Sequence, residues 1–197
     1  MLAAFKYGLA NVTNFQGRDA RQTFWYYMLL LFIGQFLVSM IVSIPMYISL
    51  FTGMFEAMSN GMNEQEATRT LMVDMIDQIK MQAIIGAVVS VIVALLFVAS
   101  FVRRLHDAGF TGWIALAPLA TQAFSVVYSL SYLDKLEEMM TTNMDNMGAA
   151  GGDPFAMQAE MGLYGMVGYI GYIIVIIFGV FRSEDGPNKY GEEPVSF

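Results

Sequence analysis

The sequence predicts an all-α, polytopic membrane protein with four transmembrane helices and long helical extensions on the extracytoplasmic side. Of its 197 residues, 56% are hydrophobic and 14% are charged, whereas soluble domains have about 45–50% and about 25%. Four apolar runs without charge each reach the roughly 20 residues that a helix needs to cross a bilayer. We therefore expect one membrane domain that covers residues 1–197.

Residues 1–22 are expected to form a cytoplasmic lead-in to the membrane. Phe5, Leu9 and Val12 recur at helical spacing, which predicts a short helix at the membrane interface. Two arginines and then the aromatic run Phe24–Tyr27 follow. Basic residues directly before Trp and Tyr indicate a helix that enters the bilayer from the cytoplasm.

The first predicted span covers residues 24–51. Pro45 is expected to kink it or to weaken its hydrogen bonding near the far end, because proline removes a helical hydrogen bond. Residues 60–63, Asn-Gly-Met-Asn, are typical of a turn. The first helix therefore ends in an outer segment, residues 52–82, that reverses the chain.

The second helix is predicted to begin near Glu64 and to continue unbroken to about Asp107. Asn63 is a suitable N-cap, and acids follow it near the positive end of the helix dipole. Apolar residues then keep a helical period as far as the second span, residues 83–102. This helix is much longer than its membrane-spanning part.

The third span is predicted at residues 113–132. Gly109 is a helix terminator, Thr111 can cap the next helix, and Trp113 can anchor it at the interface. Helical character continues beyond the span through the second outer segment, residues 133–160.

The chain between residues 148 and 154 contains glycines and a proline that break this helix. The fourth span, residues 161–181, follows, and residues 182–197 form a polar cytoplasmic tail. Glycines recur every three residues in the span, which predicts close packing against another helix. They are Gly162, Gly165, Gly168 and Gly171.

Four spans place both termini on one side of the membrane. Seven of the ten basic residues lie on that side, and eleven of the seventeen acids lie in the two outer segments. Because basic residues collect in the cytoplasm, both termini are predicted to be cytoplasmic. The net charge of −7 argues against nucleic acid as a partner.

Polar residues also gather on the cytoplasmic side, and they form the best candidate site. Arg103 and Asp107 have ion-pair spacing on a helix, and His106 titrates near neutral pH. One interpretation is a binding site for an anionic group such as a lipid phosphate. The other is structural, with paired charges that fix the helix ends. The candidates are Arg18, Arg21, Arg103, Arg104, His106, Asp107, Asn188 and Tyr190.

The outer segments are rich in methionine. Examples are Met54, Met58 and Met62 in the first outer segment and Met140 and Met144 in the second. Thioethers suit Cu(I), but methionine also fills packing gaps between helices. Extracytoplasmic soft-metal binding is therefore a lesser alternative function, and we expect no metal site.

Known enzyme motifs are missing from the sequence. We therefore expect a protein without enzymatic activity, catalytic residues or a cofactor. A transporter or channel subunit is an alternative, although the spans carry no ionisable residue of the kind that transport usually needs. Its polar pathway would have to use residues such as Gln35, Ser90 and Gln122.

Three segments together resemble a bacterial inner-membrane family, domain of unknown function 805. They are Phe15–Trp25, with Gly-Arg-Asp-Ala-Arg; Arg103–Trp113, with Arg-Arg-Leu-His-Asp; and Gly186–Pro194, with Gly-Pro-Asn-Lys-Tyr-Gly. The resemblance implies a small polytopic protein of the bacterial plasma membrane, normally with four helices, and no established activity. The long, acidic, methionine-rich outer segments depart from the usual form of the family.

The function predicted from these observations is that of a non-enzymatic scaffold, or of a module that binds lipids or partner proteins in the inner membrane. The expected partners are membrane lipids and other membrane proteins.

Overall fold

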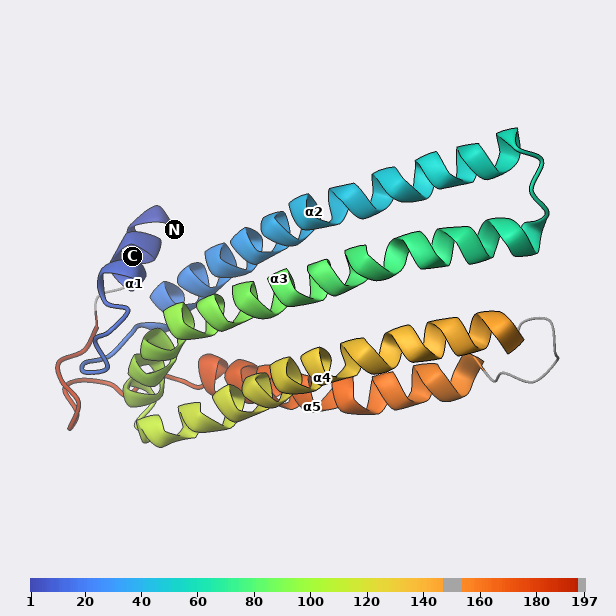
Figure 1. Cartoon of the computed structure of the whole chain (residues 1–197). Coiled ribbons are helices and arrows are strands. Elements are labelled where there is room, and N and C mark those ends of the chain that lie inside the picture. Colours follow the sequence, from blue (N-terminus) through green and yellow to red (C-terminus); the bar gives the residue numbers. More distant parts are fainter. Residues whose placement is uncertain (147–153, 195–197) are drawn as a thin grey trace. The chain divides into compact units, whose positions relative to one another are not determined.

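The computed structural model of the chain is all-helical (Figure 1). It describes the backbone of residues 1–146 and 154–194, and the side chains in these ranges outside 64–65, 68–69, 72–74, 134, 136–146 and 154–165. The elements are α1 (Leu2–Ala10), α2 (Arg21–Ser59), α3 (Glu64–Asp107), the 3₁₀ helix η1 (Gly112–Ala115), α4 (Leu116–Asn146) and α5 (Pro154–Val180).

Within the described residues, three helices are long and apolar enough to cross a membrane. They cover Arg21–Ser59, Met75–Asp107 and Gly112–Leu133, and a shorter apolar helix covers Met166–Val180. The prediction of a helical membrane protein is confirmed at this level. The number of spans and the side on which the extensions lie remain predictions.

The predicted limits of the second helix are confirmed, because α3 extends from Glu64 to Asp107. At its start, Asn63 Oδ1 accepts a hydrogen bond from the Glu66 backbone N–H at 2.9 Å. The Glu66 carboxylate accepts in turn from the Asn63 N–H at 3.4 Å. This reciprocal capping box satisfies backbone donors that the first helical turn leaves free.

The end of α3 also follows the prediction. Gly109 has a φ of +80°, the left-handed conformation that glycine adopts without steric cost. The Phe110 N–H donates back to the Leu105 carbonyl at 2.9 Å. Thr111 then caps η1 by accepting from the Trp113 N–H.

In the remaining helices, α2 continues through Pro45 without interruption. The predicted break at residues 148–153 lies outside the described residues. Pro154 occupies the first position of α5, where its missing N–H costs no helical hydrogen bond.

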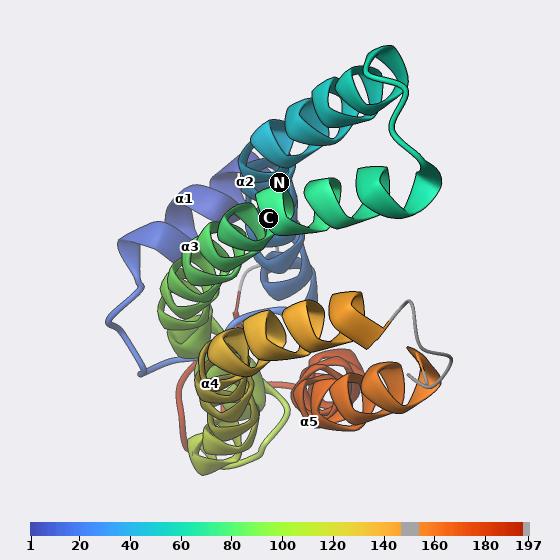
Figure 2. The same cartoon turned by 45° about the vertical axis from the view of Figure 1, so that its right-hand side comes forward.

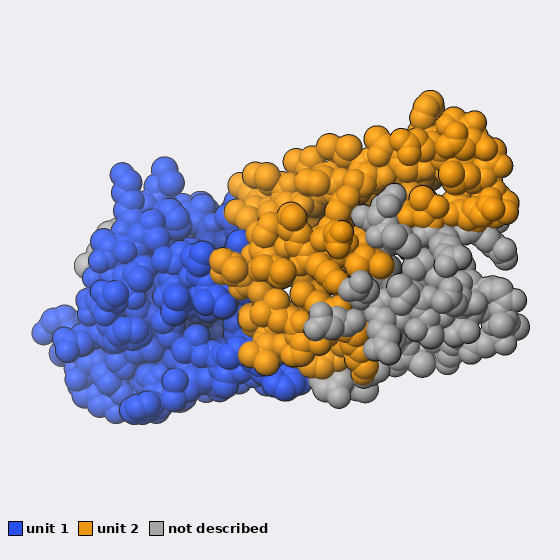
Figure 3. Space-filling view, in the orientation of Figure 1, with its two compact units in different colours: residues 1–36, 89–125, 163–197 blue, residues 37–88, 126–162 orange. Residues whose placement is uncertain are grey.

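The chain divides into two compact units, which Figure 3 colours separately. Unit 1 comprises residues 1–36, 89–125 and 163–197, and unit 2 comprises residues 37–88 and 126–162. The division falls inside α2, α3, α4 and α5, so each unit contains part of each of these helices. The expectation of a single membrane domain remains a prediction.

Unit 2 contains a helical hairpin made from the end of α2 and the start of α3. Gln78 and Gln82 of α3 donate hydrogen bonds to Ser49 and Ser43 of α2, respectively. Ala57 is also buried there. The predicted reversal of the chain at residues 60–63 therefore produces a paired hairpin.

Unit 1 has a hydrophobic core formed by residues of α2, α3, η1 and α5. Phe24, Phe101 and Leu105 are completely buried in it, and Val175 of α5 packs with them. Two further contacts between helices are polar. Trp25 Nε1 donates to the Gly179 carbonyl at 3.2 Å, and the Tyr27 hydroxyl lies 2.9 Å from the Leu96 carbonyl.

Helix α1 lies beside the start of α2 and the end of α3 in both views (Figures 1 and 2). Its Ala4 and Gly8 are buried. A Cβ at Gly8 would overlap the Tyr27 ring, so only glycine permits this approach. Of the residues predicted to lie at the membrane interface, Leu9 is 42% exposed, whereas Phe5 packs against the Tyr27 ring with centroids 5.9 Å apart.

Two members of the predicted glycine face pack closely in unit 1. A Cβ at Gly168 would lie 2.9 Å from Ser125 Oγ, and a Cβ at Gly171 would overlap Thr121 Oγ1. These contacts join α5 to α4. The packing around Gly162 and Gly165 lies outside the part of the structure that is described.

Candidate functional site

The structure brings most of the predicted site residues together in unit 1 and buries their charges. Arg18 is 5% exposed, Arg103 is 1% exposed, and Arg104 and Asp107 are completely buried. Asp19, which the sequence did not single out, is 2% exposed beside them. We call these five residues, Arg18, Asp19, Arg103, Arg104 and Asp107, the ion cluster.

Arg103 pairs with Asp19. Its Nε donates to Asp19 Oδ1 at 2.8 Å. The Ser100 hydroxyl donates to the other carboxylate oxygen of Asp19 at 2.7 Å, and the Asp19 N–H donates to the Arg103 carbonyl at 3.1 Å. The predicted pairing of Arg103 with Asp107 is therefore wrong, because each partner has a different counter-ion.

Asp107 is shared by two arginines. Arg18 Nε and Nη2 lie 3.1 and 3.0 Å from its Oδ1. Arg104 Nη1 and the Ser183 hydroxyl contact its Oδ2. The Asp107 carboxylate thus holds together the segment before α2, the end of α3 and the segment after α5.

The three guanidinium groups also bind backbone carbonyls where helices end. Arg104 donates to the carbonyls of Gly179 and Phe181, at the C-terminal end of α5. Carbonyls in the last helical turn have no helical partner, and a cation there is favourable because of the helix dipole. Arg104 therefore caps α5 from α3.

Arg103 and Arg18 bind two irregular segments in the same way. Arg103 Nη1 donates to the carbonyls of Asn11 and Asn14, which follow α1. Arg18 donates to the carbonyls of Glu184 and Gly186 in the tail, both at 2.6 Å. A planar guanidinium with five donors suits this role better than an ammonium group would.

His106, Asn188 and Tyr190 form a second layer on the ion cluster. The imidazole of His106 stacks on the Tyr190 ring with centroids 3.8 Å apart and planes 6° apart. Its Nδ1 lies 3.3 Å from the Gly17 carbonyl oxygen. Asn188 Nδ2 donates to the His106 carbonyl at 3.0 Å. The tail is thereby fixed to the end of α3.

Arg21 is the predicted residue that the structure does not bring into the buried cluster. Its side chain is exposed at the start of α2. In contrast, sequence reasoning missed Asp19, Ser100 and Ser183. Asp19 had a usable signal, because it is an acid between two arginines in the motif that precedes the first apolar run. The two serines had none.

The ion cluster contains three arginines and two aspartates, so its formal charge is +1. One atom, Arg103 Nη2, is buried without a hydrogen-bond partner, while the guanidinium carbon lies 5.6 Å from the centroid of the Tyr7 ring. A cation over an aromatic face is favourable when it is shielded from water. Most donors in the ion cluster are already bound to protein acceptors.

Within the described part of the chain, acidic, histidine and cysteine side chains form no group of three or more that could hold a metal ion. Met54 and Met58, two methionines of the proposed soft-metal alternative, are 52% and 81% exposed. The side chains of Met140 and Met144 lie outside the described ones.

Long apolar helices and a buried ion cluster that joins their ends define a helical membrane protein. The chain belongs to the family described as Protein of unknown function (DUF805), whose family model matches residues 12–192. This range includes all three segments on which the sequence resemblance rested. No curated protein and no solved structure matches the chain.

Proposed function

We propose that this protein is a non-enzymatic scaffold of the bacterial inner membrane, which holds its helices in a fixed arrangement so that they can bind lipids and partner membrane proteins. The observation that carries the proposal is the ion cluster. Its charges are buried, each arginine is paired with an aspartate, and the arginines bind several segments of the chain.

The burial of the ion cluster favours this role over anion binding. A lipid phosphate would have to displace Asp107 or the carbonyls of the tail, because these already occupy the guanidinium groups of Arg18 and Arg104. Sites that bind phosphate present donors that are free before the ligand arrives. Here the donors serve the fold.

The length of the helices supports extensions outside the bilayer. A helix of 39 residues, such as α2, would be about 58 Å long at about 1.5 Å per residue. The hydrocarbon core is only about 30 Å thick. The distribution of basic residues favours four spans with cytoplasmic termini and with the extensions outside.

The membrane arrangement is tested by reporter fusions to the full chain. Fusions after residues 61 and 151 should report the extracytoplasmic side, and fusions after residues 110 and 197 the cytoplasmic side. The opposite pattern would refute the orientation. A fusion after residue 151 that reports the cytoplasm, with the others as expected, would refute the four-span count.

The scaffold role is tested by affinity purification from membranes in a mild detergent, with identification of the copurifying lipids and proteins. The variant Asp19→Asn should lose the specific partners, because it breaks the Arg103–Asp19 pair without adding bulk. The variant Asp185→Asn, which breaks the exposed Arg182–Asp185 pair, is the matched control. Retention of all partners in Asp19→Asn would contradict the proposal.

A further inference from the structure

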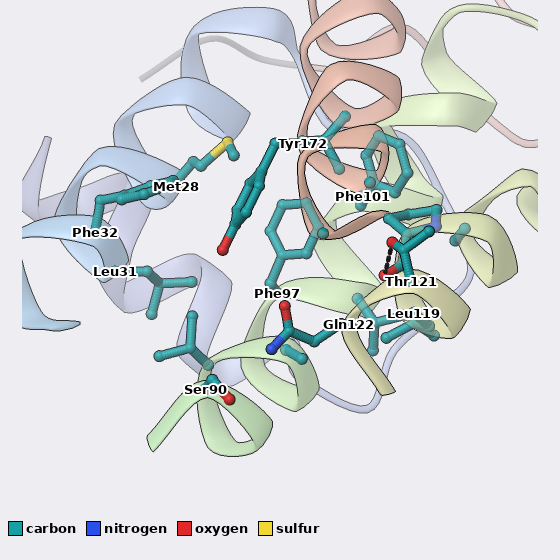
Figure 4. Close-up of a pocket in the computed structure, with 18 of the residues that line it drawn as sticks. Met28, Leu31, Phe32, Ser90, Phe97, Phe101, Leu119, Thr121, Gln122 and Tyr172 are labelled. Atoms are coloured by element: carbon teal, nitrogen blue, oxygen red, sulfur yellow. Dashed lines mark hydrogen bonds between the residues drawn. The ribbon is translucent and has the colours of Figure 1, made fainter. Parts of the chain in front are cut away.

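Unit 1 contains a pocket that the ion cluster does not use. It lies between α2, α3, α4 and α5 and has a volume of about 90 Å³ (Figure 4). Its inner wall includes Leu31, Phe101 and Val175, which are 7%, 0% and 3% exposed. This wall is shielded from the surroundings of unit 1.

The rim of the pocket includes two exposed rings where α2 and α5 meet. Phe32 of α2 and Tyr172 of α5 both line it and are 48% and 42% exposed. Their rings lie 6.3 Å apart between centroids. The neighbouring exposed side chains on the two helices are apolar, for example Ile33 and Ile173. In a membrane, this rim faces lipid chains rather than water.

The chemistry of the lining is apolar with a few neutral polar groups. None of the described residues that line the pocket is charged, and Gln122, Gln35 and Tyr172 supply amide and hydroxyl groups. Figure 4 shows the Gln122 amide and the Tyr172 hydroxyl directed into the space around Phe97. A lining of this kind accepts an uncharged ligand, whereas a buried ionic group would be left without a counter-ion.

The volume limits which part of a ligand can enter. An engineered apolar cavity of about 150 Å³ holds one benzene molecule. A pocket of about 90 Å³ is smaller than that, so it accommodates a flexible chain better than a ring system. Part of the acyl chain of a membrane lipid is a flexible apolar group of this kind.

We propose that this pocket binds part of the acyl chain of a membrane glycerolipid, in contact with Phe97, Gln122 and Tyr172. The chain enters from the bilayer between Phe32 and Tyr172. This inference rests on the membrane location in the proposed function but needs neither the scaffold role nor the ion cluster. The lipid is either a phospholipid or a free acylglycerol, because both carry the same ester-linked chain.

The test uses two probes that carry a photoactivatable diazirine within the acyl chain, a phosphatidylethanolamine and a monoacylglycerol. The full-length protein is reconstituted in vesicles of phosphatidylethanolamine and phosphatidylglycerol that contain one probe. After irradiation, mass spectrometry maps the labelled residues. We expect labels on pocket residues such as Phe97 and Tyr172 with at least one probe. The probe that labels them identifies the source of the chain.

Two variants fill the pocket from different helices, Ala94→Phe from α3 and Leu119→Trp from α4. Each should reduce pocket labelling about tenfold, the factor expected when about two methylene groups lose their burial. Leu95→Phe, next to Ala94 but 60% exposed and outside the pocket, is the matched control and should leave labelling unchanged. Circular dichroism selects the variants that fold.

The proposal is overturned if neither probe labels the pocket in the wild-type protein, or if labelling persists in a folded filling variant. Labelling confined to the exposed faces of the helices has the same meaning. These outcomes are separate from failure of the proposed function. If the proposed function failed, the reporter fusions would show a different topology, or the copurified partners would not depend on Asp19.

Discussion

Arg103 donates to Asp19, 84 residues earlier in the chain, at 2.8 Å. It does not pair with Asp107, one helical turn further along α3, because that carboxylate binds Arg18 and Arg104. The ion pairs therefore connect segments that are distant in the sequence. They hold the segment before α2 to the end of α3, and hydrogen bonds from Arg18 and Arg104 bind the segment after α5 to the same place.

The Arg103–Asp19 pair should contribute strongly to stability, since removal of one partner leaves a buried charge. We expect Asp19→Asn to lower the free energy of unfolding by about 3–5 kcal/mol. Arg103→Met should also destabilise the protein, and the double variant should be less destabilised than the two single effects added together. The measurement is unfolding in mixed micelles with increasing dodecyl sulfate, followed by tryptophan fluorescence.

The control for this comparison of single and double variants is the exposed pair of Arg182 and Asp185, which lies in the tail after α5. Exposed ion pairs contribute little because water and salt screen them. Asp185→Asn should therefore leave the unfolding curve unchanged. Equal effects of Asp19→Asn and Asp185→Asn would show that burial does not decide the strength of the pair.

Helix limits were predictable from the sequence because local signals set them. The capping box at Asn63 and Glu66, and the left-handed Gly109, act within a few residues. Composition alone also indicates that the helices are apolar. Whether four of them span a membrane depends on the bilayer, which is outside the chain.

The members of the site were predictable but their partners were not. Polar residues between apolar runs stand out in any sequence, so Arg18, Arg104 and Asp107 were found. Pairing in space depends on how helices pack. A spacing of four residues suggested Arg103 with Asp107, but that rule applies to isolated helices, and here a segment from the start of the chain competes for Arg103.

The close contact of α5 with α4 should fail when Gly171 receives a larger side chain. A Cβ at this position would overlap Thr121 Oγ1 and lie 3.2 Å from the Pro118 Cα atom, which belongs to the backbone and cannot rotate away. We expect Gly171→Val to lower the free energy of unfolding by about 1–3 kcal/mol. Thermal unfolding in detergent measures the effect.

A matched control for this substitution is Gly34→Ala in α2, where a Cβ meets no atom within 4 Å. Alanine has a higher helix propensity than glycine, so Gly34→Ala should stabilise the protein by up to about 1 kcal/mol. If Gly171→Val is as stable as the wild type, α4 and α5 do not pack through this glycine.

The stack of His106 on Tyr190 should determine how firmly the tail is held. Aromatic pairs contribute about 0.5–1.5 kcal/mol beyond burial, so Tyr190→Ala should increase the opening of the tail about two- to tenfold. Tryptic cleavage after Lys189, timed by mass spectrometry, reports this opening. Tyr190→Phe keeps the ring and should be cleaved at the wild-type rate; faster cleavage of that variant would assign the effect to the hydroxyl.

Tyr7 should make the protein sensitive to alkaline pH. Burial in α1, together with the negative charge of Asp19, raises the pKa of its hydroxyl above the ordinary value of 10.0, although Arg103 opposes the shift. A pKa that is raised in the folded state favours folding below pH 10, and that contribution is lost as pH rises through the folded-state pKa. Wild-type protein should therefore lose more stability than Tyr7→Phe above pH 10. Dodecyl sulfate unfolding at pH 8 and at pH 10.5–11.5 measures the difference between the two proteins. Parallel loss of stability in both would mean that Tyr7 ionises in the folded protein as it does in the unfolded chain.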